Sequence, residues 1–134
     1  MINIIVITHG EFGAYLIEAA ENIVGEQKEG IKSVSVSPRM SLPMIHEKVQ
    51  EAVEEMRGPE GLICFIDMPG GTPMNVAVPI LQNLDKTAAV CGVNLNMVIS
   101  AFFNRSKYGF EDLIEKVISD GKKAICEVKS LLED

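Results

Sequence analysis

The chain has 134 residues, 47% of them hydrophobic and 23% charged, which is the length and composition of one globular domain. This composition excludes a disordered chain, because there is enough apolar material to form a packed core. Twelve basic against nineteen acidic residues give a net charge of −7, which argues against a nucleic-acid-binding protein and against binding to an anionic membrane surface.

Cysteine usage and the N-terminus indicate the compartment. Cys64, Cys91 and Cys126 lie in apolar runs and form no C-x-x-C pair, so we interpret them as small buried hydrophobes in a reducing compartment. The apolar run at the N-terminus is too short to span a membrane and lacks the basic residues of a signal peptide. We therefore expect a soluble, cytoplasmic protein.

Short β-branched runs recur along the chain. The runs at 2–7 and 61–66 are almost wholly apolar, which is typical of strands covered on both faces of a parallel sheet. The run at 87–93 predicts the fourth strand. The run at 31–36 is more polar and fits an edge strand. A weaker run at 123–128 predicts a short fifth strand, and a polar tail follows it to residue 134.

Amphipathic stretches separate these runs. Apolar residues recur at intervals of three and four, which predicts helices. In the first helix this stripe contains Phe12, Tyr15, Leu16, Ala19, Ala20 and Ile23. The later helices are predicted around 45–56, 74–83, within 94–105, and at 110–121.

Two of these helices carry start signals. Ser41 is predicted to cap the second helix. Thr72 is predicted to cap the third, with Pro73 as its first residue. Pro79 inside the third helix removes a backbone hydrogen bond.

The alternation of strands and helices predicts a single α/β domain over residues 1–134, with a mostly parallel sheet covered by helices on both faces. If the strands take the order 2-1-3-4, ligands bind beyond the carboxyl ends of the first and third strands, where the connections leave to opposite faces. His9 follows the first strand and Asp67 follows the third. We therefore expect these two side chains to be neighbours.

Such a pair has a definite chemistry. A carboxylate can hold one ring nitrogen of a histidine as N–H and leave the other as a nucleophile. Gly70 and Gly71 allow the backbone to approach a group on that nitrogen, and the helix start at Thr72 offers N–H groups to an anion. This combination predicts a phosphohistidine site. The alternatives are a structural histidine, an aspartate that caps a turn, and an ordinary glycine turn.

Other polar residues are weaker candidates for a functional role. His46 and Arg39 fit solvated side chains, although Arg39 follows the second strand and could reach an anion. Neither histidine lies in a cluster of cysteines or carboxylates, so we expect no metal site.

Three stretches of this chain resemble the mannose-type enzyme IIA domain of the bacterial sugar phosphotransferase system. They are residues 4–10, which end in Thr8-His9-Gly10, residues 67–75, which contain Gly70-Gly71-Thr72-Pro73, and residues 92–95. They occur in the order and spacing of that family, and the likeness extends over about residues 1–128.

The resemblance implies a phosphotransferase component with a phosphohistidine intermediate and no cofactor. His9 would accept a phosphoryl group from the phosphocarrier HPr and pass it to an enzyme IIB partner on a separate chain, which serves sugar uptake through the membrane components IIC and IID. Asp67 would orient His9, and Thr72 would lie beside the phosphoryl group. The resemblance also implies a homodimer in which the fifth strand, antiparallel to the others, crosses to the partner subunit.

The chain departs from the family pattern at two positions. Asn96 stands where proline is common, and Pro79 interrupts a helix that usually lacks it. Both departures concern partner docking rather than the predicted chemistry. The transported sugar, or a purely regulatory role, is left open, as is the related phosphocarrier domain that serves dihydroxyacetone kinase.

Two further functions compete with this interpretation. A receiver-like signalling module would be phosphorylated on Asp67 itself with the help of a divalent metal, but no acidic pair follows the first strand. A hydrolase would use Thr72, His9 and Asp67 as a triad, but Thr72 is better explained as a helix cap and no oxyanion hole is evident.

Overall fold

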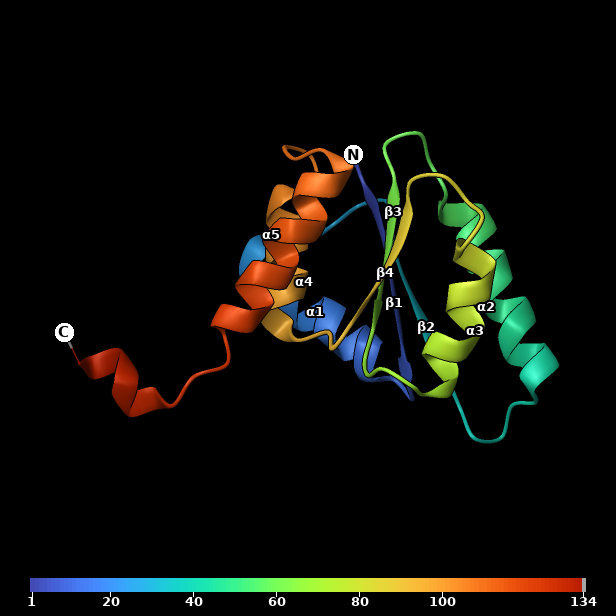
Figure 1. The fold of residues 1–134 in the computed structure, drawn as a ribbon, viewed down its shortest axis with the longest axis horizontal. Helices are drawn as coiled ribbons and strands as arrows, with labels where there is room; N and C mark the ends of the chain where they lie inside the picture. Colours follow the sequence, from blue (N-terminus) through green and yellow to red (C-terminus); the bar gives the residue numbers. More distant parts are fainter. Residues whose placement is uncertain (134) are drawn as a thin grey trace.

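The computed structural model describes residues 1–133 and contains a four-stranded parallel sheet in the order β2-β1-β3-β4 (Figure 1). The predicted strand order is therefore confirmed, and the polar run at 31–36 does form an edge strand. The strands are β1 (Asn3–His9), β2 (Ile31–Val36), β3 (Leu62–Ile66) and β4 (Thr87–Cys91).

Helices cover both faces of this sheet, which gives three layers (Figure 1). One face carries α1 (Phe12–Val24), α4 (Leu95–Asn104) and α5 (Phe110–Lys123). The other face carries α2 (Leu42–Met56) and α3 (Thr72–Leu81). None of the helices described between residues 1 and 133 combines the length and apolar character needed to cross a membrane.

The two central strands fill two separate cores. Along β1, Ile4 and Val6 pack under α1, α4 and α5, whereas Ile5 and Ile7 pack under α2 and α3. All four side chains are fully buried, and each contributes roughly 1.5–3 kcal/mol by leaving water. Continuous apolar runs therefore form the middle of the sheet, because a strand with helices on both faces has no solvent-facing side.

One of the two predicted helix caps is confirmed and the other is wrong. The Ser41 hydroxyl accepts the N–H of Met44 (3.3 Å), as a cap does. Thr72 is not a cap: Gly71 takes the capping position, and Thr72 is the first residue of α3. Glycine is a common residue at this position, since it reaches the required backbone angles without strain.

The predicted stripe on α1 is confirmed at Leu16 and Ala20 and wrong at its exposed members. Leu16, Ile17, Ala20 and Val24 pack against the core, whereas Phe12, Tyr15 and Ile23 are exposed. Both sets satisfy a spacing of three and four residues, so periodicity could not separate them.

The predicted fifth strand is absent from the part of the chain that the structure describes. Lys123 still belongs to α5, which continues past Gly121, and Val128–Leu132 forms a short 3-10 helix, η1. This segment leaves the body of the molecule (Figure 1), so it has no strand beside it to pair with. Asp134, the last residue of the predicted tail, lies outside the described residues.

The three cysteines differ in their surroundings. Cys64 is buried in β3, and burial raises the pKa of its thiol to about 12. Cys91 is half-buried. Cys126 is exposed on the C-terminal segment, which corrects the expectation that all three are buried.

A buried arginine ties the opposite end of the sheet together. Arg105 is 2% exposed and donates to the backbone oxygens of Ile2 (2.9 Å) and Glu29 (2.8 Å) and to the Gln27 side chain (3.1 Å). Burial lowers the pKa of this guanidinium. Its donors join β1, the α1–β2 connection and the end of α4, so Arg105 fixes these segments relative to one another.

We predict that Arg105→Met lowers the free energy of unfolding by about 3 kcal/mol, because the buried Ile2 carbonyl and the acceptors of two part-buried hydrogen bonds lose their partner. Urea unfolding of the wild type and the variant measures this difference. Arg57→Met, at an exposed arginine, is the matched control and should change the value by less than about 0.5 kcal/mol. Equal losses in the two variants would contradict the role assigned to Arg105.

Candidate functional site

The first and third strands end side by side at one edge of the sheet. β1 and β3 are paired in parallel, from Asn3 opposite Leu62 to Ile7 opposite Ile66. The chain then leaves β1 for α1 on one face and leaves β3 for α3 on the other. This is the switch point at which doubly wound sheets bind their ligands.

His9 and Asp67 are in direct contact at this point. The Asp67 Oδ2 atom lies 2.8 Å from His9 Nδ1 and also accepts the backbone N–H of His9 (2.9 Å). The other carboxylate oxygen accepts the backbone N–H of Met68 (2.9 Å). The prediction that these two side chains are neighbours is confirmed; the roles assigned to them remain predictions.

The electrostatics favour an ionised Asp67. Burial alone would raise the pKa of this carboxyl, whose side chain is only 13% exposed. The hydrogen bonds from the His9 backbone and ring, the charge attraction of His9 and the Met68 N–H outweigh burial and lower the pKa. Because an ionised carboxylate only accepts hydrogen bonds, His9 Nδ1 carries the hydrogen of this bond, and in the neutral form of the ring the lone pair is therefore on Nε2.

The free nitrogen of His9 faces the glycine loop. The His9 side chain is 51% exposed. A Cβ placed on Gly71 would lie 3.5 Å from His9 Nε2 and 3.1 Å from Cε1. Gly71 therefore leaves space beside Nε2 that any other residue would reduce. Gly70 has φ +82°, a conformation that favours glycine.

The start of α3 adds donors near this space. Residues of the first helical turn have no carbonyl partner within the helix, and the helix dipole makes this end positive. Pro73 is the second residue of α3 and has no N–H, which leaves the amides of Thr72 and Met74. Since Thr72 does not cap the helix, its hydroxyl makes no capping hydrogen bond.

One residue that holds the site was missed by sequence analysis. The Thr8 hydroxyl, on a residue only 1% exposed, accepts the N–H of Gly13 (2.8 Å) and donates to the carbonyl of Gly10 (3.2 Å). It thus closes the turn that carries His9. A threonine at the end of an apolar strand gives no signal of this role, because β-branched residues are common there.

The remaining sequence candidates form no hydrogen bond or ion pair with His9 or Asp67 among the described residues. Arg39 and His46 are exposed. Among residues 1–133, no group of three histidine, cysteine or acidic side chains comes close enough together to hold a metal ion.

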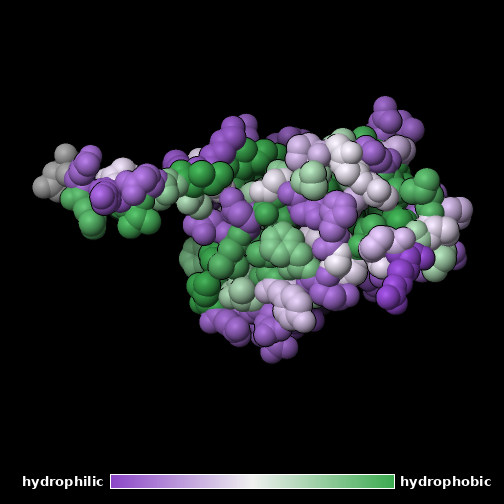
Figure 2. Space-filling view, turned by 90° about the horizontal axis from the view of Figure 1, so that it is seen from below, coloured by the Kyte–Doolittle hydropathy of each residue, from purple (hydrophilic) through white to green (hydrophobic). Residues whose placement is uncertain are grey.

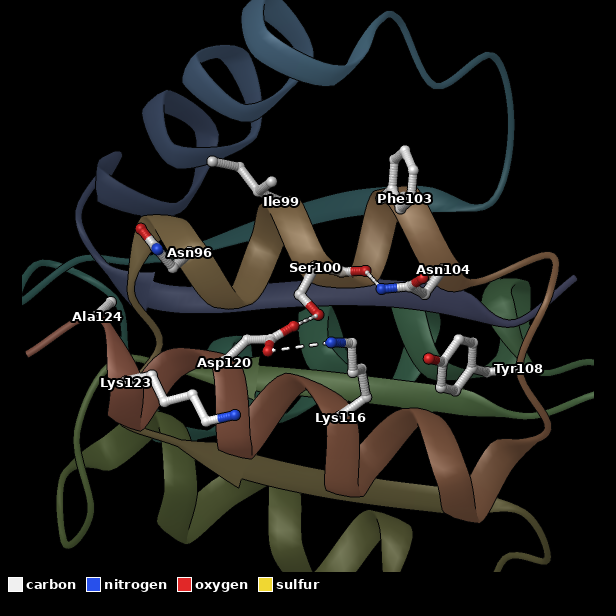
Figure 3. A pocket seen from close by; sticks show the side chains of 10 residues that line it. All are labelled: Asn96, Ile99, Ser100, Phe103, Asn104, Tyr108, Lys116, Asp120, Lys123 and Ala124. Carbon is white, nitrogen blue, oxygen red and sulfur yellow. Dashed lines mark hydrogen bonds and ion pairs between the residues drawn. The ribbon is translucent and has the colours of Figure 1, made fainter.

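A cavity of about 600 Å³ lies elsewhere, between α4 and α5 (Figure 3). Its central polar groups bond to one another: the Ser100 hydroxyl donates to Asp120 (2.7 Å), Lys116 pairs with Asp120 (3.2 Å), and the Asn104 amide donates to the Ser100 carbonyl (2.9 Å). None of its lining residues belongs to the loops after β1 and β3. Because these groups already satisfy one another, the cavity is a weaker candidate site than the His9–Asp67 pair despite its size.

The fold and the site together define a doubly wound α/β protein with a histidine–carboxylate pair at its switch point. Residues 3–118 match the family described as the PTS system fructose IIA component, EIIA-man. The chain therefore belongs to the mannose-type enzyme IIA family of the sugar phosphotransferase system, whose members are phosphotransferase components.

Curated relatives agree with this assignment. The mannose-specific EIIAB component of Escherichia coli K12 is 25% identical over 130 residues, which cover 96% of this chain and 40% of the relative. The chain thus spans less than half of that relative's length. The fructose-specific EIIA component of Bacillus subtilis 168 is 26% identical over 128 residues, which cover 94% of this chain and 87% of the relative.

Solved structures agree as well. A PTS IIA protein associated with the fucose utilization operon of Streptococcus pneumoniae has a TM-score of 0.87 at 25% identity, covering 98% of this chain and 96% of the other. The mannose/sorbose-specific IIA subunit from Enterococcus faecalis has a TM-score of 0.83 at 25% identity, covering 93% and 92%. Both share the parallel α/β fold described above.

We predict that Asp67→Asn destabilises the protein at pH 7 and that this difference shrinks as the pH falls below 4. The pKa of Asp67 is lower in the folded than in the unfolded chain. Its stabilising contribution is therefore complete above the unfolded pKa of about 3.9 and is lost as the pH falls through the folded value.

Urea unfolding of the wild type and the variant between pH 7 and pH 3 measures this dependence, with a loss of about 1–3 kcal/mol expected at pH 7. Asp85→Asn, at an exposed aspartate, is the matched control and should stay within about 0.5 kcal/mol of the wild type. A constant difference across the whole pH range would show that the Asp67 charge contributes nothing.

Proposed function

We propose that the protein carries a phosphoryl group on Nε2 of His9, accepting it from phospho-HPr and passing it to an enzyme IIB partner. The observation that supports this most is the His9–Asp67 contact of 2.8 Å at Nδ1, with Nε2 directed at the glycine loop. That arrangement leaves one ring nitrogen as a nucleophile at a place where an anion has room.

The transfer is a displacement at phosphorus. The Nε2 lone pair forms the new P–N bond while the bond between phosphorus and the donor breaks, and the donor keeps that electron pair. His9 gains positive charge as this bond forms, and the Asp67 carboxylate at Nδ1 stabilises it. No proton has to leave the ring during the step, because the hydrogen stays on Nδ1 and remains hydrogen-bonded to Asp67.

The loop from Gly70 to Thr72 would receive the phosphoryl oxygens. The amides at the start of α3 and the Thr72 hydroxyl are donors suited to an anion, and the helix dipole adds a favourable field. Gly71 leaves the space for it, since a side chain at that position would meet the His9 ring. In this account the phosphoryl group needs no metal ion.

The receiver-like alternative has less support. Both oxygens of Asp67 already accept hydrogen bonds, from His9 and from Met68. Receiver-type acceptors also need acidic partners for a divalent metal, and residues 1–133 contain no cluster of metal-ligating side chains. An aspartate engaged in this way is better suited to orient the histidine than to accept the phosphoryl group itself.

The hydrolase alternative also has less support, because a triad needs the Thr72 hydroxyl bonded to the histidine base. The described residues show no hydrogen bond between Thr72 and His9; the His9 ring bonds to Asp67 instead. The phosphocarrier domain that serves dihydroxyacetone kinase would use the same histidine chemistry, and the named relatives favour sugar transport over it.

The surface around His9 suits a protein partner rather than a small substrate. Three exposed apolar side chains, Phe12, Leu42 and Met68, each follow the end of one strand at this edge. Figure 2 shows that face of the molecule, where hydrophobic side chains are interspersed among polar ones. We propose that HPr and enzyme IIB dock here in turn, in the cytoplasm, with the membrane components IIC and IID served indirectly.

The relatives' names mention mannose, fructose, fucose utilization and sorbose. We therefore infer a role in the uptake of a hexose-like sugar and do not choose among these.

We predict that incubation with phosphoenolpyruvate, enzyme I and HPr labels the wild type on His9, while His9→Gln takes up no label. His46→Gln is the matched control, at an exposed histidine on α2, and should label like the wild type. Asp67→Asn should retain the fold and slow transfer by about 10- to 1000-fold, since the positive charge on the ring loses its stabilisation. Labelling of His9→Gln at the wild-type level would refute the assignment.

We also propose a homodimer held by the C-terminal segment. Ile125, Val128, Leu131 and Leu132 are all exposed, and Figure 2 shows hydrophobic side chains along the projecting segment. β4 is an edge strand with the apolar sequence Thr-Ala-Ala-Val-Cys. Such an edge pairs readily with an added strand. We propose that the C-terminal segment of a second copy pairs with β4.

We predict that the full chain sediments as a dimer and that the double substitution Val128→Glu, Leu131→Glu gives a monomer, because charges are costly in an apolar interface. Analytical ultracentrifugation at micromolar concentration measures the mass. Ile23→Glu, at an exposed apolar residue on α1, is the control and should remain dimeric. A monomeric wild type would contradict the proposed dimer.

A further inference from the structure

The backbone of Gly70 is bonded on both sides by side chains from the first turn of α3. Its N–H donates to the sulfur of Met74 (3.4 Å), and its carbonyl accepts from the amide of Asn75 (3.5 Å). No heavy atom lies within 4 Å of the place where a Cβ of Gly70 would be. On that side the loop has no packing contact, so these two hydrogen bonds hold Gly70 in place.

The position of Gly70 determines where the next residue lies. Gly71 approaches the His9 ring so closely that a Cβ on it would be 3.1 Å from Cε1 and 3.5 Å from Nε2. A rotation of the Gly70 peptide would therefore move Gly71 toward or away from the nitrogen that has the lone pair.

Methionine has a specific advantage at this position. A thioether is a weak but neutral acceptor. It can hold the Gly70 N–H without placing negative charge next to a site for an anion, as a carboxylate would. An aliphatic side chain of the same size would fill the same space but could not hold the N–H, which in this exposed loop would bond to mobile water instead.

We propose that Met74 and Asn75 are positioning residues for phosphoryl transfer: together they hold Gly70 so that Gly71 leaves the phosphoryl space beside His9 Nε2 open. This inference rests on the proposed function of His9. It assigns to α3 a second task besides presenting its N-terminus, namely to fix the shape of the loop before the phosphoryl group arrives.

The test compares Met74→Leu, which removes the acceptor, with Met74→Gln, which restores an acceptor on a side chain of similar length. Met44→Leu is the matched control, at an exposed methionine on α2. Phosphoramidate serves as a small phosphoryl donor, so that partner docking does not enter the measurement. The two readouts are the rate of His9 phosphorylation and the hydrogen-exchange rate of the Gly70 amide in the unphosphorylated protein.

We expect Met74→Leu to speed Gly70 exchange and to slow phosphorylation, each by about three- to tenfold, as the loss of one hydrogen bond implies. Met74→Gln and Met44→Leu should stay close to the wild type in both readouts. The melting temperature should change little, which separates positioning from stability. Asn75→Ala should resemble Met74→Leu.

The outcomes are distinguishable. If the wild type takes no phosphoryl group on His9, the proposed function fails and the positioning role fails with it. If the wild type is labelled and Met74→Leu is labelled at the same rate, only the role of Met74 is overturned. Equal slowing in Met74→Leu and Met74→Gln would also overturn it, because the acceptor would then be irrelevant.

Discussion

The contact between Asp67 and His9 is the interaction on which the site depends. One carboxylate oxygen accepts both the backbone N–H and the ring nitrogen of His9, at 2.9 and 2.8 Å. The backbone bond fixes the position of the residue and the ring bond fixes its orientation, so a single atom sets both. The same bond places the hydrogen on Nδ1 and the lone pair on Nε2. The chemistry proposed for this protein follows from that placement.

The rest of the fold brings these two residues together and keeps them there. They lie 58 positions apart in the chain and become neighbours because β1 and β3 pair in parallel. Apolar side chains on both faces of β1 and β3 bury the centre of the sheet. At the far end Arg105, which follows α4, bonds to Ile2 at the start of β1 and to the α1–β2 connection. A rigid sheet with loops at its edge is the usual arrangement for functional residues.

Much of this arrangement follows from the sequence. Runs such as 2–7 and 61–66 are recognisable because strands buried on both faces are continuously apolar. The order of strands and helices then predicts the switch point, and with it the meeting of His9 and Asp67. The α/β class, the strand order and the family are confirmed by the structure and the relatives.

What the sequence could not supply depends on contacts between distant residues or on offsets of one position. Periodicity predicts only part of the buried face of α1, because the exposed Phe12, Tyr15 and Ile23 have the same spacing as the buried residues. Threonine and glycine are both suitable cap residues, so the sequence could not show that Gly71 rather than Thr72 occupies that position. The run at 123–128 has the residues of a strand but no neighbouring strand in this chain to pair with, and the structure has the end of α5 and the start of η1 there instead. The bonds of Thr8 and Met74 to backbone amides have no sequence signal at all.

The most direct test of the central claim is to identify which nitrogen of His9 becomes phosphorylated. After phosphorylation through HPr, the coupling between ³¹P and the ¹⁵N-labelled ring reports the bonded atom. The account predicts phosphorus on Nε2, with Nδ1 still protonated against Asp67. Phosphorus on Nδ1, or a base-labile acyl phosphate on Asp67, would contradict it.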